Sequence, residues 1–426
     1  MGHWDLVVVG AGAAGLVAAA RAAERGHKVL LLEKNRKPGA KILMSGGTRC
    51  NLTHATDARG IVEAFGPPGR FLFSALHRLG PQGVVDLFES EGVRTKVEPA
   101  GKVFPASDRA LDVLGALLAR LKRSGAELAP AQPLHALERT GDGFRLVTSR
   151  GTLSASKVIL TPGGRSYPGC GTAGDGYGWA AGLGHTIVPP RPALVPFRTD
   201  APWVPPLKGV TMSDVFVRVV ERPVGDLAKS RSERRAAKGR AGVLAECRGS
   251  FLFTHFGLSG PAVLNVSRAA SACERPEHLV VECDFLPGMP AAELDAQIIR
   301  ESTAAGKRQM ASLVARWLPH RLAETLARRA GVDPEGRAAQ LGKADRARLV
   351  GAIKHLAVPI TGTLGFKKAE VTAGGVALDE VDSRTMQSRL VPGLYVAGEL
   401  LDLDGPIGGY NFQAAFSTGF LAGDSA

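Results

Sequence analysis

Cysteine is scarce in this sequence, and the spacing of the few present excludes several kinds of site. Cysteine occurs at five positions, an odd number without any CxxC pair: Cys50, Cys170, Cys247, Cys273 and Cys283. This pattern argues against a disulfide framework, a zinc ribbon and a dithiol reductase. We therefore expect no metal site, and we expect a protein of the reducing cytoplasm.

Long apolar runs are also missing. The early uncharged stretch from Leu6 to Ala20 is shorter than the roughly 18 to 20 residues that a membrane span needs. No basic region precedes it, so we do not interpret it as a signal peptide. The chain has 426 residues, of which 45% are hydrophobic and 22% charged. These values are typical of a soluble globular protein of two or three domains.

Acidic residues are too few to balance the basic ones, and the formal net charge is +13. Such an excess is compatible with a nucleic-acid partner. The densest basic run, residues 229–240, contains no aromatic side chain on which a base could stack. We interpret the run as a solvated loop, with RNA contact as the less favoured alternative.

The first 34 residues have the pattern of a βαβ unit. Residues 6–9 form a short apolar run rich in β-branched side chains, typical of a strand buried in a parallel sheet. A glycine-rich turn at 10–15, an Ala-rich helix at 16–25 and a second apolar strand at 28–33 follow. This order predicts a nucleotide-binding unit, with a purely structural βαβ unit as the alternative.

The glycines of the turn have separate roles. Gly10 permits the tight turn, Gly12 lets a pyrophosphate approach the backbone, and Gly15 lets the helix lie close to the strand. Glu33 ends the second strand, where a carboxylate accepts hydrogen bonds from an adenosine ribose. The predicted dinucleotide contacts at the turn also include Ala13 and Ala14.

The loop after the second strand supplies basic and small residues for the same ligand. Two lysines lie close to the predicted pyrophosphate, and the glycines let a flat ring approach the backbone. A plain connecting loop is the alternative. The candidate contacts in this loop are Lys34, Lys41, Ser45, Gly46, Gly47, Arg49, Cys50 and Asn51.

Later strands again end in glycine, at the sheet edge where parallel sheets bind cofactors. A helix at 412–422 follows such a turn, and its N-terminus can stabilise negative charge on a ring system. Asp175 is expected to cap a helix. A second GxGxxG at 169–174 lacks a preceding strand and a following acid, so we reject it. The candidate contacts of these segments are Thr161, Gly163, Gly164, Asp175, Gly398, Glu399, Gly408, Gly409, Tyr410, Asn411 and Phe412.

A proline cluster that starts at 189–192 indicates a domain crossing. Before it, residues 71–130 have mostly helical periodicity; after it, alternating strands are followed by helices. We predict a discontinuous nucleotide-binding domain formed by residues 1–190 and 359–426. An insert at 191–358 separates its two segments, with strands at 191–288 and helices at 289–358.

Together these segments resemble the BaiN-like (YhiN) family of NAD(P)/FAD-dependent flavoprotein oxidoreductases over essentially the whole chain. The SGGxRCN block at 45–51 and the GGYN block at 408–411 are its most specific parts, and the segment at 253–261 is among the others that contribute. It implies an α/β fold, with a Rossmann FAD-binding domain of glutathione-reductase type and a β-barrel-like plus helical insert. Thr48 departs from the family pattern, which has glycine there, and Thr161-Pro162 stands where Ala-Thr is usual.

The resemblance also implies roles for individual residues toward FAD. Glu33 would hold the adenosine ribose, Glu399 the ribityl side of FAD, and residues 408–412 the pyrimidine edge of the isoalloxazine. Because no second βαβ fingerprint is present, a nicotinamide would dock on the flavin itself. We expect an FAD-dependent oxidoreductase of a small organic substrate bound between the domains. The alternatives are a flavoprotein acting on RNA and a flavin-binding protein without turnover.

Three residues are candidate proton donors for such a reaction. His255 follows an apolar strand, where a lone histidine is more often structural. Tyr410 belongs to the glycine turn near the predicted ring. Cys50 has no partner cysteine close in sequence, so packing beside the ring is more plausible for it than redox activity.

Overall fold

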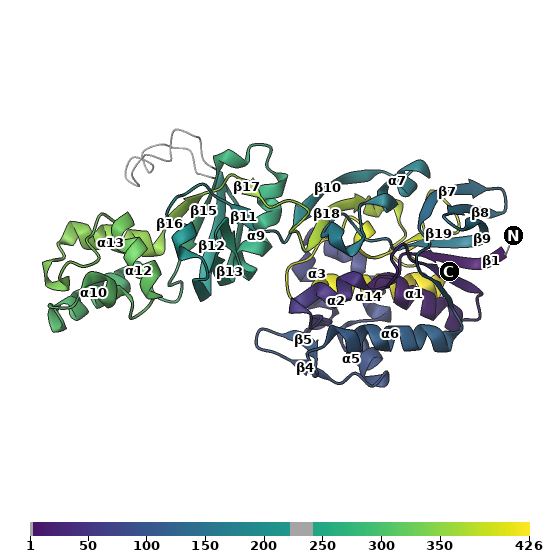
Figure 1. Cartoon of the computed structure of the whole chain (residues 1–426), viewed down its shortest axis with the longest axis horizontal. Coiled ribbons are helices and arrows are strands. Elements are labelled where there is room, and N and C mark those ends of the chain that lie inside the picture. The colour runs from purple at the N-terminus through teal and green to yellow at the C-terminus, as the bar shows by residue number, and fades with distance from the viewer. Residues whose placement is uncertain (1–2, 222–241) are drawn as a thin grey trace. The chain divides into compact units, whose positions relative to one another are not determined.

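The computed structural model describes residues 3–221 and 242–426, and the basic run at 229–240 lies outside them. The chain divides into two compact units, Met1–Arg191 with Glu370–Ala426, and Pro192–Ala369 (Figure 1). Residues 359–369, which we expected in the last segment, thus cluster with the second unit, because their backbone pairs with strands there. In the described ranges, no helix is both long enough and apolar enough to cross a membrane.

The first unit is built on a mixed sheet with the strand order β6-β2-β1-β9-β8-β7, in which β19 also pairs with β9. Strand β1 is parallel to β2 and β9, with Val7 opposite Leu30 and Val158. Every residue of β2 is buried, as the apolar run predicts for a strand covered on both faces. The strands are β1 His3–Val9, β2 Val29–Leu32, β6 Glu127–Ala129, β7 Leu134–Thr140, β8 Gly143–Thr148, β9 Gly151–Leu160 and β19 Leu394–Val396.

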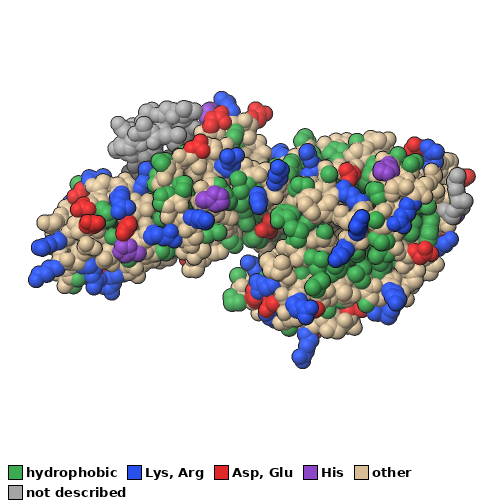
Figure 2. Space-filling model, viewed as in Figure 1, with side chains coloured by type: hydrophobic (Ala, Val, Ile, Leu, Met, Phe, Trp, Pro, Cys, Tyr) green, Lys and Arg blue, Asp and Glu red, His purple; other side chains and the backbone are tan. Residues whose placement is uncertain are grey.

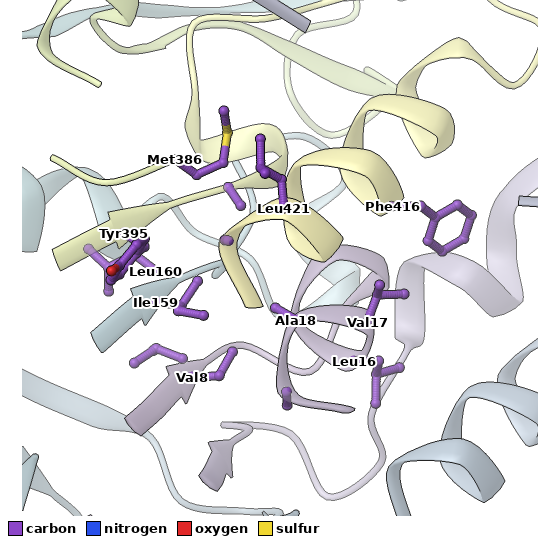
Figure 3. Close-up of a cluster of buried hydrophobic side chains, with 14 of the residues drawn as sticks. Val8, Leu16, Val17, Ala18, Ile159, Leu160, Met386, Tyr395, Phe416 and Leu421 are labelled. Carbon is purple, nitrogen blue, oxygen red and sulfur yellow. The ribbon is translucent and has the colours of Figure 1, made fainter. Parts of the chain in front are cut away.

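Helices cover this sheet, and the N- and C-terminal segments of the chain meet there. Helix α1 packs against both α14 and α6. Figure 3 shows Val17 of α1 and Leu421 of α14 in the same apolar cluster as Val8 and Ile159 of the sheet. The helices of this unit are α1 Ala13–Glu24, α2 Ala40–Met44, α3 Ala58–Phe65, α4 Phe73–Arg78, α5 Pro81–Ser90, α6 Ala110–Ser124, α7 Asp175–Gly182 and α14 Tyr410–Ser425.

Two further small sheets belong to the first unit. Strands β10 Ile187–Ala193 and β18 Val371–Val376 form one of them. Strands β3 Thr53–His54, β5 Lys102–Pro105 and β4 Thr95–Val97 form the other, which is antiparallel. The sequence predicted mostly helix at 71–130 and missed β4 and β5. Both strands are short, and β3, which pairs with β5, lies some 50 residues earlier.

Two predicted helix starts differ from the structure. Asp175 is not a cap but the first residue of α7; Gly174, with φ +87°, is the cap. Helix α14 begins at Tyr410, two positions before the expected start, and Gly409 is its cap. In both cases a glycine in the left-handed region ends the preceding loop, and because it has no side chain, the first N–H groups of the helix receive no side-chain cap.

The second unit joins an antiparallel sheet to a group of helices. The expected β-barrel-like portion is a seven-stranded sheet in the order β16-β15-β12-β13-β14-β11-β17, packed against α9. Its strands are β11 Phe197–Arg198, β12 Thr211–Glu221, β13 Gly242–Phe253, β14 Gly257–Ser259, β15 Leu279–Asp284, β16 Leu356–Pro359 and β17 Gly362–Thr363. The helices of this unit are α9 Pro261–Ala272, α10 Ala291–Ala304, α11 Met310–Val314, α12 His320–Arg329 and α13 Lys343–Lys354.

Candidate functional site

The glycine turn between β1 and α1 has the geometry of a pyrophosphate site. Gly10 has φ +102°, and a Cβ atom on it would lie 2.5 Å from the carbonyl oxygen of Thr161. A Cβ atom on Gly15 would overlap the carbonyl oxygen of Gly10, whereas one on Gly12 would have no atom within 4 Å. Helix α1 starts without a side-chain cap and without an acid in its first turn. Free N–H groups therefore face open space beside Gly12, which fits a bound pyrophosphate.

Glu33 lies directly after β2 and is anchored from both sides. One carboxylate oxygen accepts a hydrogen bond from the N–H of Ala11 at 2.9 Å, and the other accepts one from the N–H of Asn35 at 2.8 Å. The residue is only 8% exposed. Because a carboxylate has about four acceptor positions, both oxygens keep capacity for the hydroxyls of a ribose.

A second carboxylate, Glu399, connects three segments that are distant in sequence. The Lys41 Nζ lies 2.5 Å from its Oε2, and the N–H of Thr372 donates to its Oε1 at 2.9 Å. The hydroxyl of Ser166 also donates to Oε1. A Cβ atom on Gly164 would lie 3.0 Å from the same oxygen. The predicted residues Lys41, Gly164 and Glu399 thus meet, while Ser166 and Thr372 were missed because nothing in the sequence links them to this position.

The turn before α14 brings an unpaired acceptor to an uncapped helix end. Gly408 and Gly409 have φ +128° and +98°, and a Cβ atom on Gly409 would collide with the carbonyl group of Thr53. Among the described residues, no donor reaches the buried Oδ1 of Asn51, which would lie 2.8 Å from such a Cβ atom. Helix α14 has no side-chain cap and no acid in its first turn. An acceptor and a positive helix end together fit the pyrimidine edge of a flavin, which carries an N–H group and gains negative charge on reduction.

Arg49, a predicted cofactor contact, is instead bound within the protein. Its guanidinium group lies 2.6 Å from Glu98 and 3.3 Å from Asp108, and it stacks 4.0 Å above the ring of Phe104. These contacts fasten the loop to β5 and its neighbours. Arg49 therefore stabilises the conformation of the glycine loop, and its positive charge is already neutralised.

Three more predicted contacts have protein partners in the structure. Lys34 Nζ lies 2.5 Å from Asp175, so these two side chains pair with each other. The Asn411 side chain accepts from the N–H of Gly405 at 2.8 Å and donates to its carbonyl oxygen at 2.9 Å, which closes the loop before α14. The structure places the other predicted contacts at helix starts and turns. Ala13 and Ala14 begin α1, and Phe412 lies in the first turn of α14. Ser45, Gly46 and Gly47 form a short turn after α2, Gly163 follows β9, and Gly398 follows β19.

The three candidate proton donors have different environments. Cys50 is fully buried, and burial raises the pKa of its thiol to about 12. Tyr410 is half-buried at the start of α14, and burial raises the pKa of its hydroxyl. His255 belongs to the second unit and is exposed. The tyrosine stacks on His54, a residue that the sequence analysis did not select although it directly follows the SGGTRCNLT block.

Thr48 occupies a backbone conformation that suits glycine, at φ +69°. For a β-branched residue, this conformation costs about 1 to 2 kcal/mol. Glycine removes this cost, but part of the gain is offset because glycine has more conformational freedom to lose on folding. We expect Thr48→Gly to raise the unfolding free energy of the apoprotein by about 0.5 to 1 kcal/mol, measured by urea titration. Thr303→Gly on the exposed side of α10 should lower it instead, and a loss at both positions would refute the argument.

Comparisons with known proteins agree with this geometry. The chain is 33% identical to the ribosomal RNA dihydrouridine synthase of Escherichia coli (strain K12) over 421 residues, which cover 98% of this chain and 96% of the relative. It is also 33% identical to the 3-dehydro-bile acid delta(4,6)-reductase of Clostridium scindens over 424 residues, 98% of both proteins. Among solved structures, an open-conformation flavocytochrome c3 fumarate reductase aligns with 99% of this chain and 78% of its own, at 17% identity and a TM-score of 0.49.

A family model gives the assignment. The model described as HI0933-like protein Rossmann domain matches residues 4–425. The match and the two relatives confirm the family, the FAD cofactor and the enzyme class that the sequence predicted. The chain therefore belongs to the HI0933-like (YhiN/BaiN) family of flavoproteins and is an FAD-dependent oxidoreductase.

Proposed function

We propose that this protein reduces uracil bases of ribosomal RNA to dihydrouracil, with FAD as cofactor and NADH or NADPH as electron donor. The observation that carries the proposal is the identity of 33% with a ribosomal RNA dihydrouridine synthase over nearly the whole of both chains. The net charge of +13 supports it, because a polyanionic substrate is bound largely through phosphate contacts. This reverses the preference for a small substrate that the sequence alone favoured.

The chemistry adds one hydride and one proton across the C5–C6 double bond of uracil. When bound and reduced by NADH or NADPH, FAD would supply the hydride, and the protein would hold and orient the cofactor. In the proposed arrangement, the turn at Gly12 binds the pyrophosphate, Glu33 the adenosine ribose and Glu399 the ribityl side. The N-terminus of α14 then stabilises negative charge at the pyrimidine edge of the ring.

Tyr410 is the proposed proton donor. It starts α14, beside the glycines that would contact the ring. The thiol of Cys50 is a weaker candidate because it is fully buried, whereas Tyr410 is only half-buried. Replacement of Tyr410 by Phe would keep its ring and remove the hydroxyl group that donates the proton.

Exposed cations offer contacts for an RNA backbone. Figure 2 shows Lys and Arg side chains spread over the viewed face of the second unit. Lys307, Arg308 and Arg337 are exposed, and a β-bridge between Gln309 and Arg337 joins their segments. None of the three forms an ion pair within the described residues, so their charge stays available for phosphate.

The proposal predicts dihydrouridine in RNA treated with the purified enzyme. Unmodified ribosomal RNA would be incubated anaerobically with the FAD-loaded protein and NADPH or NADH, then digested and analysed by mass spectrometry. We expect a gain of two mass units at uridine, and RNA binding that weakens steeply with salt. A 3-dehydro-Δ4,6 steroid serves as the parallel substrate, since the second relative is a bile acid reductase. Reduction of the steroid without any dihydrouridine would overturn the RNA proposal and favour a small-molecule reductase.

A further inference from the structure

His54 makes two contacts with the turn that precedes α14. Its ring stacks on Tyr410 with a centroid distance of 4.7 Å and an interplanar angle of 20°. Its Nδ1 lies 3.1 Å from the carbonyl oxygen of Gly408. Because a carbonyl oxygen only accepts, this contact requires the hydrogen on Nδ1, which donates to Gly408.

The opposite side of the histidine ring is also held. A Cβ atom on Gly101 would lie 2.5 Å from Nε2 of His54, so the ring fills the space above this glycine. The backbone of His54 pairs with Lys102 in the small sheet of β3 and β5. The ring therefore lies between Tyr410 and the β4–β5 turn that contains Gly101, and its contact with Gly408 is held in place.

The residue before His54 ties the same strand to α14. The Thr53 hydroxyl donates to Oε1 of Gln413 at 2.5 Å, and the Gln413 amide donates to the carbonyl oxygen of Leu79 at 2.9 Å. All of Thr53 and Gln413 is buried. Strand β3 thus holds the first turn of α14 at two successive positions, once through Thr53 and once through His54.

We propose that His54 is a positioning residue for FAD, which acts by fixing the Gly408–Gly409 turn. Gly408 and Gly409 both have positive φ angles. Glycine has more conformational freedom than any other residue, so ordering two in succession costs conformational entropy. The hydrogen bond to Gly408, more than the stack on Tyr410, restricts the turn before the cofactor arrives. The N-terminus of α14 is then already aimed at the ring, so less binding free energy is lost on ordering.

Two variants separate hydrogen bonding from packing. His54→Asn keeps an N–H donor at the position of Nδ1 but loses most of the stacked ring, whereas His54→Phe keeps a stacked ring but has no donor. We expect His54→Phe to weaken FAD binding to the apoprotein about tenfold, the size of one net hydrogen bond, and His54→Asn to stay within about threefold of the wild type. His77→Phe, on an exposed position of α4, is the matched control and should change nothing.

The measurement is the quenching of FAD fluorescence on titration into apoprotein, with a thermal melt of each apoprotein as the control for folding. The midpoint potential of each FAD-loaded variant is the second readout, and it should shift for His54→Phe more than for His54→Asn. If His54→Phe lowers the melting temperature of the apoprotein, His54→Leu replaces it as the variant without a donor in the comparison with His54→Asn. Equal losses in the donor and non-donor variants, or wild-type affinity and potential in both, would overturn the proposal. The test uses no RNA, so its result is independent of the proposed substrate.

Discussion

Gly12→Ala is expected to weaken FAD binding at least about a hundredfold while the apoprotein stays folded. The backbone of Gly12 has φ −86°, which alanine adopts without strain, and a Cβ atom there would meet no protein atom within 4 Å. The methyl group would instead occupy the space in which the pyrophosphate approaches the N-terminus of α1. A hundredfold loss corresponds to about 2.7 kcal/mol, a modest amount for a methyl group that displaces a charged ligand.

Gly15→Ala is the companion variant, three positions along the same turn. In contrast to Gly12→Ala, it is expected to destabilise the apoprotein. Its Cβ atom would overlap the carbonyl oxygen of Gly10 and lie 2.6 Å from the Thr161 hydroxyl. Helix α1 must then move away from β1, at a cost of about 3 kcal/mol in unfolding free energy. Urea titration of the apoproteins and FAD titration together test the pair. A Gly12→Ala protein that binds FAD like the wild type would show that the pyrophosphate lies elsewhere.

Glu33→Ala is expected to lower the unfolding free energy by about 2 to 4 kcal/mol, even without FAD. The carboxylate accepts hydrogen bonds from the N–H groups of Ala11 and Asn35 in a nearly buried position, and its removal leaves both donors unpaired. The same change removes the predicted acceptors of the adenosine ribose, so FAD binding should weaken as well. Urea titration of the apoprotein measures the first effect, and fluorescence titration with FAD the second.

The control for this variant is a glutamate that also accepts hydrogen bonds from N–H groups, but on the protein surface. Glu138 contacts Arg145 at 2.9 Å on the β7–β8 hairpin, with half of its side chain exposed. Glu138→Ala should change the unfolding free energy by less than about 0.5 kcal/mol, because exposed ion pairs contribute little. Equal losses for the two variants would contradict the view that Glu33 is a buried anchor of the turn.

Much of the cofactor domain could be predicted from the order of residue types. The run at 6–9, the glycine turn and Glu33 form one local unit, and local patterns of this kind are set within about 30 residues. The glycine turns at 398 and 408 were also visible, because glycine is the residue that adopts positive φ angles at the lowest cost. Sequence was less informative about β4 and β5, where short strands depend on a partner far away in the chain.

The side-chain partners could not be predicted. Arg49 was predicted beside the flavin ring and Lys34 near the pyrophosphate, and in the structure each pairs with carboxylates that other segments bring to it. Asn411 likewise closes its own loop through hydrogen bonds with Gly405. Position in a motif shows that a residue is near the site, but the choice between ligand and protein partner depends on which groups the fold places within about 3 Å.

The sequence by itself determined the βαβ unit and its glycine turn, since these follow from spacing along one stretch of chain, and its resemblance to a known family over the whole chain implied the family and the FAD cofactor. Only the tertiary structure decided which polar groups are free to meet a ligand. It buried the Asn51 oxygen with no donor among the residues at 3–221 and 242–426, and it enclosed the Cys50 thiol. It also joined Ser166 and Thr372 to Glu399 and set His54 against Gly408. The physical reason is that hydrogen bonding and burial act over a few ångströms, between groups that folding alone brings together.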